Sequence, residues 1–225
     1  MKTNTIILFY IFLASALFAQ ALPLPSTNIE VARDYSLFNK SVELIYESTV
    51  GEMKRIVEVN DSSFILTNQA DNFKYSQTFR QREDGSYLVK TEQNVNILLI
   101  FSKHAIITYT EPVIQLPNPL KVGDTWQWTG LQLKEDDSTQ VTMTGQAIAE
   151  EVLQLPAGEF KSLKVEIVSE DVDGAKTIFT QWLVEGIGSV KMNVRMEGHG
   201  LIQIAMSILG YDEVISELKE IRYLE

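Results

Sequence analysis

Cysteine is missing from this 225-residue sequence, and histidine occurs only twice, at His104 and His199. Without cysteine the fold cannot depend on disulfides, and both thiol catalysis and thiolate metal sites are excluded. The two histidines lack the paired spacing of a metal-binding helix, and each lies in a predicted turn. We therefore expect no metal site, no cofactor and no catalytic histidine.

Basic residues are also in short supply, because 19 Lys and Arg stand against 30 Asp and Glu, for a formal net charge of −11. A surface of this sign repels nucleic acid and anionic lipid headgroups, so neither is an expected partner. Such an excess of negative charge is typical of a protein that must stay soluble after export.

The long apolar run of this sequence lies at its N-terminus. Lys2 precedes an almost unbroken apolar run over residues 6–19, and Ala19-Gln20-Ala21 supplies the small-x-small pattern that signal peptidase recognises. The run is too short for a comfortable membrane span. We expect residues 1–21 to be a cleaved signal peptide and the mature chain to begin at Leu22, in the periplasm or secreted. Because no cysteine follows the run, we expect neither a bacterial lipid anchor nor a membrane-spanning segment after cleavage.

Beyond residue 21 the hydrophobic periodicity is close to two. Apolar and polar side chains alternate through residues 190–197, and residues 42–48 and 202–208 repeat the pattern. Strands with one apolar and one polar face are typical of antiparallel sheets. With turn residues at hairpin spacing between them, the pattern predicts about a dozen strands. Helix is indicated only weakly, in residues 29–38 and 213–224, and for the second segment a polar edge strand is favoured.

A proline-rich segment divides the chain. Residues 111–123 contain three prolines and cannot form a central strand. They join a first set of strands, at about 40–109, to a second set at about 124–225. Because neither half shows a break in composition, we expect a single all-β domain over residues 22–225.

Residues 95–109 depart from simple alternation. Both faces of this predicted hairpin are apolar, on either side of a short connection at residues 102–104. Such a hairpin must be covered on both faces, so it is either a central core hairpin or the lining of a dry cavity.

The apolar residues of this hairpin and of the methionine-bearing strands are the candidates to line a ligand site. They are Leu98, Ile100, Met192, Val194, Met196, Ile204 and Met206. Methionine is flexible and polarisable, which suits adaptable apolar surfaces, but ordinary core packing accounts for the same placement. The pattern leaves both interpretations open.

The remaining short motifs indicate turns rather than chemistry. Residues 171–174 resemble the start of a calcium loop without its later ligands, and residues 198–200 lack the third glycine of a dinucleotide fingerprint. Acidic pairs at 136–137, 150–151 and 170–171 are best explained as solvated loop charges, because neighbouring strand residues point to opposite faces. We find no catalytic constellation and do not expect an enzyme.

Three motifs occur in order within residues 110–195. They are the proline-rich lead into Val122-Gly123-Asp124-Thr125-Trp126, the run Pro156-Ala157-Gly158-Glu159-Phe160, and the stretch from Trp182 through Gly186 and Gly188 to Lys191. Together they resemble a family of exported bacterial proteins sometimes labelled TapB-like. The resemblance implies a strongly curved antiparallel sheet, akin to the half-barrels of the lipoprotein carriers LolA and LolB or to a lipocalin-like barrel. It implies no activity and no site residues, and many relatives are lipoproteins, whereas this chain lacks the cysteine.

We therefore predict a mainly β protein, half-barrel or barrel-like, with little helix beyond the signal peptide. The expected function is non-catalytic binding of a hydrophobic small molecule, a lipid or an envelope-protein segment in the concave face. The alternatives are a structural or protein-interaction module with a packed core and a carboxylate-dependent hydrolase. A pocket would favour the first, a flat apolar patch the second, and a cleft with convergent carboxylates the third.

Overall fold

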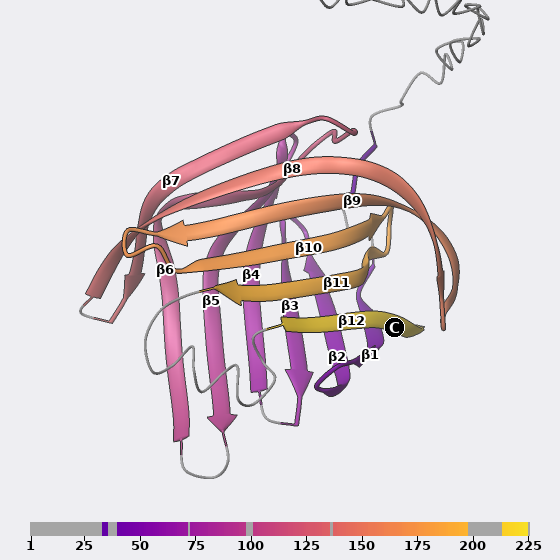
Figure 1. Ribbon diagram of the computed structural model, residues 1–225, viewed down its shortest axis with the longest axis horizontal. Helices are drawn as coiled ribbons and strands as arrows, with labels where there is room; N and C mark the ends of the chain where they lie inside the picture. The colour runs from indigo at the N-terminus through magenta and orange to yellow at the C-terminus, as the bar shows by residue number, and fades with distance from the viewer. Residues whose placement is uncertain are drawn as a thin grey trace, which may run out of the picture.

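Twelve antiparallel strands close into one barrel in the computed structural model of the chain (Figure 1). The structure describes residues 33–35, 40–71, 73–97, 101–135, 137–197 and 213–224. Each strand pairs with its neighbours in sequence, and the last strand pairs with the first to complete the ring. The described residues contain no helix. The prediction of a mainly β, barrel-like fold is confirmed.

The strands follow one another as hairpins and range from 7 to 19 residues in length. They are β1 (Val42–Ser48), β2 (Gly51–Asn60), β3 (Ser63–Ala70), β4 (Phe73–Arg82), β5 (Gly85–Ile97), β6 (Phe101–Pro117), β7 (Thr125–Lys134), β8 (Asp137–Leu155), β9 (Gly158–Asp171), β10 (Lys176–Val184), β11 (Gly188–Glu197) and β12 (Glu213–Tyr223). The alternating segments 42–48 and 190–197 thus lie in β1 and β11, while 202–208 falls outside the described residues.

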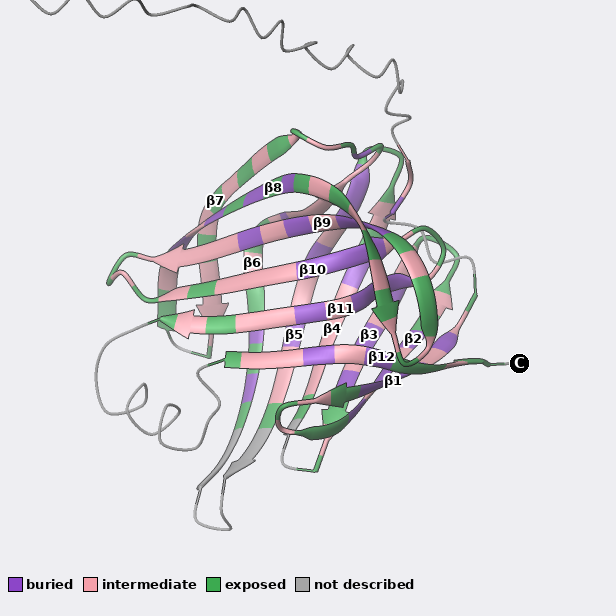
Figure 2. Ribbon diagram, turned by 45° about the vertical axis from the view of Figure 1, so that its right-hand side comes forward, coloured by how far each residue is buried: buried purple, intermediate pink, exposed green. Residues whose placement is uncertain are grey.

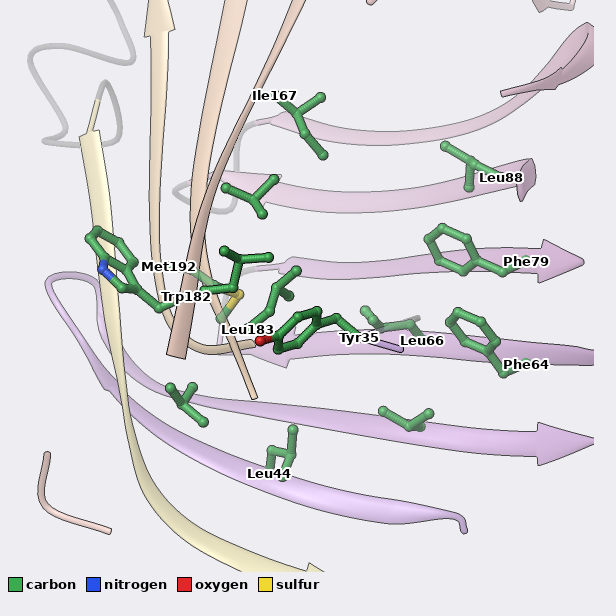
Figure 3. Packing of buried hydrophobic residues seen from close by; sticks show 14 of the residues in the cluster. Tyr35, Leu44, Phe64, Leu66, Phe79, Leu88, Ile167, Trp182, Leu183 and Met192 are labelled. Carbon is green, nitrogen blue, oxygen red and sulfur yellow. The ribbon is translucent and has the colours of Figure 1, made fainter. Parts of the chain in front are cut away.

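Two layers of strands cross at a steep angle. Strands β1 to β6 run side by side, and β8 to β12 lie across them (Figure 1). The inner faces of the two layers meet in a hydrophobic core, as in other orthogonal sheet packings. Phe64 and Phe79 stack at a centroid distance of 4.7 Å, and Leu183 and Met192 come from the crossing layer (Figure 3).

The long β8–β9 hairpin bends over the side of the barrel. A register shift between Ala147 and Ala149 marks a bulge in β8, and bulges bend and twist the strand that carries them. Beyond the bulge the hairpin reaches β12, where the backbone N–H of Ala157 donates to the carbonyl oxygen of Leu218 at 3.1 Å. The turn at the tip ends on Gly158, whose φ of 131° favours glycine. The predicted tight connection at residues 156–158 is confirmed.

Two tryptophans of β7 pack on the inner face against glycines. Trp126 lies over Gly145 of β8, and a Cβ atom built on Gly145 would be only 2.1 Å from Cε2 of Trp126. Trp128 covers Gly130 in the same way and meets the ring of Tyr109 edge-on, at 5.9 Å between centroids. The prediction that both tryptophans are packing anchors on one face is confirmed.

The proline-rich segment 111–123 is partly strand, because β6 continues through Pro112 to Pro117. Pro112 falls where β6 has no register partner in β5, since pairing passes from Thr108 to Val113 across a bulge. On its other side β6 pairs with β7 only through residues 107–109. A residue without a backbone N–H is tolerated there because no ladder hydrogen bond is needed.

Two local predictions are wrong. Residues 102–104 belong to β6 rather than to a connection, because the register pairs Asn94 with His104, and Nδ1 of His104 is hydrogen-bonded to Oδ1 of Asn94 at 2.7 Å. Residues 213–223 form a strand, but it is not an edge, since β12 pairs with both β1 and β11. Of the possible helix at 29–38, the described part contains an isolated bridge from Arg33 to Leu120.

Candidate functional site

A row of polar side chains crosses the inner face of β2 to β5. The cross-strand register places Arg55 beside Asn68, Asn68 beside Tyr75, and Tyr75 beside Gln93. Residues that are directly opposite in a sheet share one face, so these four side chains lie on the same side of the layer. Arg55 and Asn68 are only 6 % and 7 % exposed, which places this row in the interior of the barrel.

Arg55 is a buried cation with neutral neighbours. Its Nε donates to Oδ1 of Asn68 at 2.7 Å, and its Nη2 contacts the sulfur of Met192 on the crossing layer. The guanidinium carbon lies 5.5 Å from the ring centre of Tyr46. Among the described residues, no carboxylate forms an ion pair with Arg55. Burying a charge without a counter-charge lowers the stability of a protein by several kcal/mol, about 2 or more. A buried arginine without an ion pair is therefore a candidate binding group.

Three phenols belong to the inner face, of which Tyr46 is fully buried and Tyr75 and Tyr109 are half-buried. Burial raises the pKa of Tyr46, Tyr75 and Tyr109 above the ordinary value for tyrosine. The positive charge of Arg55 opposes this rise in the pKa at Tyr46 and Tyr75 but does not cancel it. At neutral pH all three are therefore uncharged, and each hydroxyl can donate a hydrogen bond. Tyr46 donates to the carbonyl oxygen of Ser189 at 2.6 Å.

Thr91 adds a buried hydroxyl to the same inner face. It lies two residues before Gln93 in β5 and is only 1 % exposed. A side-chain hydrogen bond from Thr91 lowers the pKa of both Tyr75 and Tyr109, so the three hydroxyl groups lie close together.

Three of the seven predicted lining residues lie on this interior. Met192 is 3 % exposed beside Arg55, and Val194 and Met196 follow it as half-buried side chains on the same face of β11. Figure 2 shows β11 passing from buried to intermediate and exposed along its length. The other four, Leu98, Ile100, Ile204 and Met206, lie outside the described residues. The inner wall is therefore buried beside Arg55 and less covered toward the end of β11.

The sequence analysis did not identify Arg55, although it contains a signal. Met53, Arg55 and Val57 occupy alternate positions in β2, and all three are buried. An arginine at a position where the alternation expects an apolar residue is predicted to be buried, because side chains two residues apart in a strand point to the same face.

The outer surface carries a groove of about 460 Å³ at the seam between β6 and β7. It is lined by His104, Ile106, Thr108, Leu133 and Glu135, and the Ile106 side chain is 42 % exposed. Ala105 and Ile107 on the opposite face are buried. The expectation that both faces of segment 95–109 are covered is therefore wrong at Ile106, because this side chain points to the outer face of the barrel.

The acidic pair at 150–151 lies in β8 rather than in a loop, and its members form ion pairs. Glu150 pairs with Lys161 at 2.6 Å, and Oε2 of Glu151 accepts a hydrogen bond from Nε1 of Trp182 at 2.7 Å. The ammonium group of Lys164 lies 5.2 Å from the centre of the same indole ring. These contacts join the β8–β9 hairpin to β10, so the roles of Glu150 and Glu151 are explained by the packing of the strands.

The motif at residues 171–174 forms a turn, and residues 198–200 lie outside the described residues. Oδ1 of Asp171 accepts the backbone N–H groups of Asp173 and Ala175, so this motif is a hairpin turn, as predicted. The described part of the chain contains no group of three histidine, aspartate or glutamate side chains placed to hold a metal ion. The same residues include no helix of the length and apolarity needed to cross a membrane.

Comparison with known proteins gives no family for this chain. No protein-family profile matches the sequence, and no curated protein matches it. Among solved structures, a candidate lipoprotein from Parabacteroides distasonis aligns at 12 % identity over 84 % of this chain and 100 % of its own, with a TM-score of 0.38. A candidate exported protein with a YmcC-like fold from Bacteroides fragilis aligns at 10 % identity over 83 % of this chain and 98 % of its own, with a TM-score of 0.41. At these scores neither structure informs the function, and the TapB-like resemblance stays a prediction.

Proposed function

We propose that this chain is an exported protein that binds a hydrophobic ligand in the interior of its barrel, without catalysis. The observation that carries the proposal is the incompletely covered inner wall of β10 and β11. Phe179 and Val194 are register partners there, and both are half-buried apolar side chains next to a fully buried layer. An apolar wall with a few polar groups at its base is the usual composition of a small-molecule site.

The occupant that this wall fits best is a slender apolar molecule such as an acyl chain. The barrel is hydrogen-bonded all the way round, so a bulky protein segment would have to open it. Methionine at positions 192 and 196 gives the wall an adaptable surface for a flexible chain. Export rests on the signal-like residues 1–21, and N-terminal sequencing of the protein recovered outside the cytoplasm is expected to begin at Leu22.

A neutral fluorescent probe, N-phenyl-1-naphthylamine, tests the site directly. The wild-type protein should bind it with a rise in fluorescence. Val194→Trp places a large ring on the inner wall and should weaken binding by about tenfold or more. The matched control is Arg195→Trp, because Arg195 is the exposed neighbour on the outer face and forms only a surface ion pair.

Two results would refute the proposed site. Absence of probe binding by the wild-type protein would leave a packed barrel that acts as a structural or protein-interaction module. Equal weakening by Val194→Trp and Arg195→Trp would place the probe on the outer surface. Native mass spectrometry of protein purified without detergent provides the complementary measurement, since a bound acyl compound would appear as added mass.

A further inference from the structure

We infer that the hydrophobic ligand ends in a single carboxylate and that Arg55 binds this carboxylate inside the barrel. The inference rests on the proposed function of the interior and adds the chemistry of the ligand's polar end. Three features of the described residues carry it: an uncompensated buried charge, a phenol that can donate a hydrogen bond near it, and a match in the amount of charge.

The first feature is the charge itself. Arg55 is the one charged side chain among the buried residues of the described ranges. The chain is rich in acid, with 30 Asp and Glu, yet the ion pairs of the described residues join carboxylates to other cations, such as Glu43 to Lys54 on the outer face. Burial of a cation is stabilised when an anion enters the same low-dielectric space. A ligand anion would supply that counter-charge.

The second feature is a hydrogen-bond donor near this charge. Tyr75 is the register partner of Asn68, which binds Arg55, and it lies close enough to Arg55 for that charge to lower its pKa. A carboxylate accepts several hydrogen bonds and takes an arginine in a planar, two-point geometry. The hydroxyl of Tyr75, which lies near the guanidinium of Arg55, can therefore donate to the same bound anion.

The third feature is the amount of charge. A carboxylate carries one negative charge, which equals the single positive charge of Arg55. A phosphomonoester carries about 1.5 to 2 negative charges at neutral pH, so part of that charge would stay buried without compensation. The interior thus favours a carboxylate over a phosphate as the polar end of the ligand.

The experiment compares three molecules with the same twelve-carbon chain, namely laurate, methyl laurate and dodecyl phosphate, by displacement of N-phenyl-1-naphthylamine at pH 8. We expect wild-type protein to bind laurate about tenfold or more tightly than methyl laurate. Arg55→Gln should bring the ratio of the two affinities close to one.

Tyr75→Phe provides a second variant that keeps both the aromatic ring and Arg55. It should weaken laurate binding by about threefold to tenfold and change methyl laurate binding less, because the carboxylate accepts the stronger hydrogen bond from the hydroxyl. If Arg55→Gln fails to fold, as judged by circular dichroism, this variant and the laurate-to-ester ratio of the wild-type protein decide the question.

The outcomes separate the two proposals. Equal wild-type affinity for laurate and methyl laurate, with the probe still bound, would overturn the carboxylate inference and leave the hydrophobic site standing. Tighter binding of dodecyl phosphate than of laurate would overturn the choice of a carboxylate. Failure of every compound and of the probe to bind would refute the proposed function itself.

Discussion

Replacing Arg55 by methionine and Asn68 by leucine together is expected to make the ligand-free protein more stable. Arg55 is 6 % exposed and Asn68 is 7 % exposed, so both polar groups have given up their hydration in the folded state. Replacing buried charged groups by apolar residues of similar volume is often neutral or stabilising by about 1–4 kcal/mol. Methionine follows the path of the arginine stem, and leucine keeps the branched shape of asparagine with somewhat larger terminal groups.

The single variant Arg55→Met separates the two contributions. It removes the buried charge but leaves Oδ1 of Asn68 without its donor at 2.7 Å, which costs about 1–3 kcal/mol. Loss of the contact with the Tyr46 ring adds about 0.5–1 kcal/mol. We therefore expect the single variant to lie within about 1 kcal/mol of the wild type and the double variant to be more stable by about 2 kcal/mol.

Urea unfolding of protein freed of lipid, followed by tryptophan fluorescence and circular dichroism, measures both values. Lys54→Met is the control, because Lys54 is 43 % exposed, pairs with Glu43 on the outer face and should change stability by less than about 0.5 kcal/mol. A double variant that is less stable than the wild type by about 1 kcal/mol or more, with an unchanged denaturant slope, would refute the reasoning. It would mean that Arg55 stabilises the unliganded barrel and is not held there for a ligand.

Three further predictions concern packing, pH and closure. Gly145→Ala should lower the free energy of unfolding by about 1–3 kcal/mol, because its Cβ would lie 2.1 Å from Cε2 of Trp126; an unchanged urea midpoint would contradict the packing. Stability should fall as pH rises above about 10, because burial raises the pKa of Tyr75 in the folded chain and the unfolded chain releases that proton first. Tyr75→Phe should reduce this alkaline loss in urea titrations at pH 9 to 11, and identical pH profiles of the two proteins would count against it. Thr108→Cys with Leu133→Cys, at register partners across the narrow β6–β7 seam, should form a disulfide on a non-reducing gel and raise stability by about 3 kcal/mol; a stable barrel whose cysteines never oxidise would show that the seam is paired differently.

Much of the strand layout follows from local chemistry. Alternation in segments such as 42–48 and 190–197 predicts strands because side chains of a strand point to opposite faces in turn. The turn at residues 171–174 and the tip at 156–158 follow from residues that tolerate tight turns. Residues 102–104 were missed because their polar side chains look like a turn, whereas pairing with β5 extends the strand through them.

The candidate site was less accessible to such reasoning. Met192, Val194 and Met196 follow from the alternation in β11, which places them on one face. Arg55 is visible only as a charge in the apolar phase of β2. Its meaning depends on Asn68, thirteen residues away in the sequence, and on Met192, which is 137 residues away.

By itself, the sequence determined that this chain forms antiparallel strands without cross-links, because period-two hydrophobicity and hairpin turns act over a few residues. Only the tertiary structure decided that β12 closes the ring against β1, and that Arg55 lies inside it beside neutral partners. Both depend on contacts between residues far apart along the chain, and the register of those contacts is set when all twelve strands pack around one core.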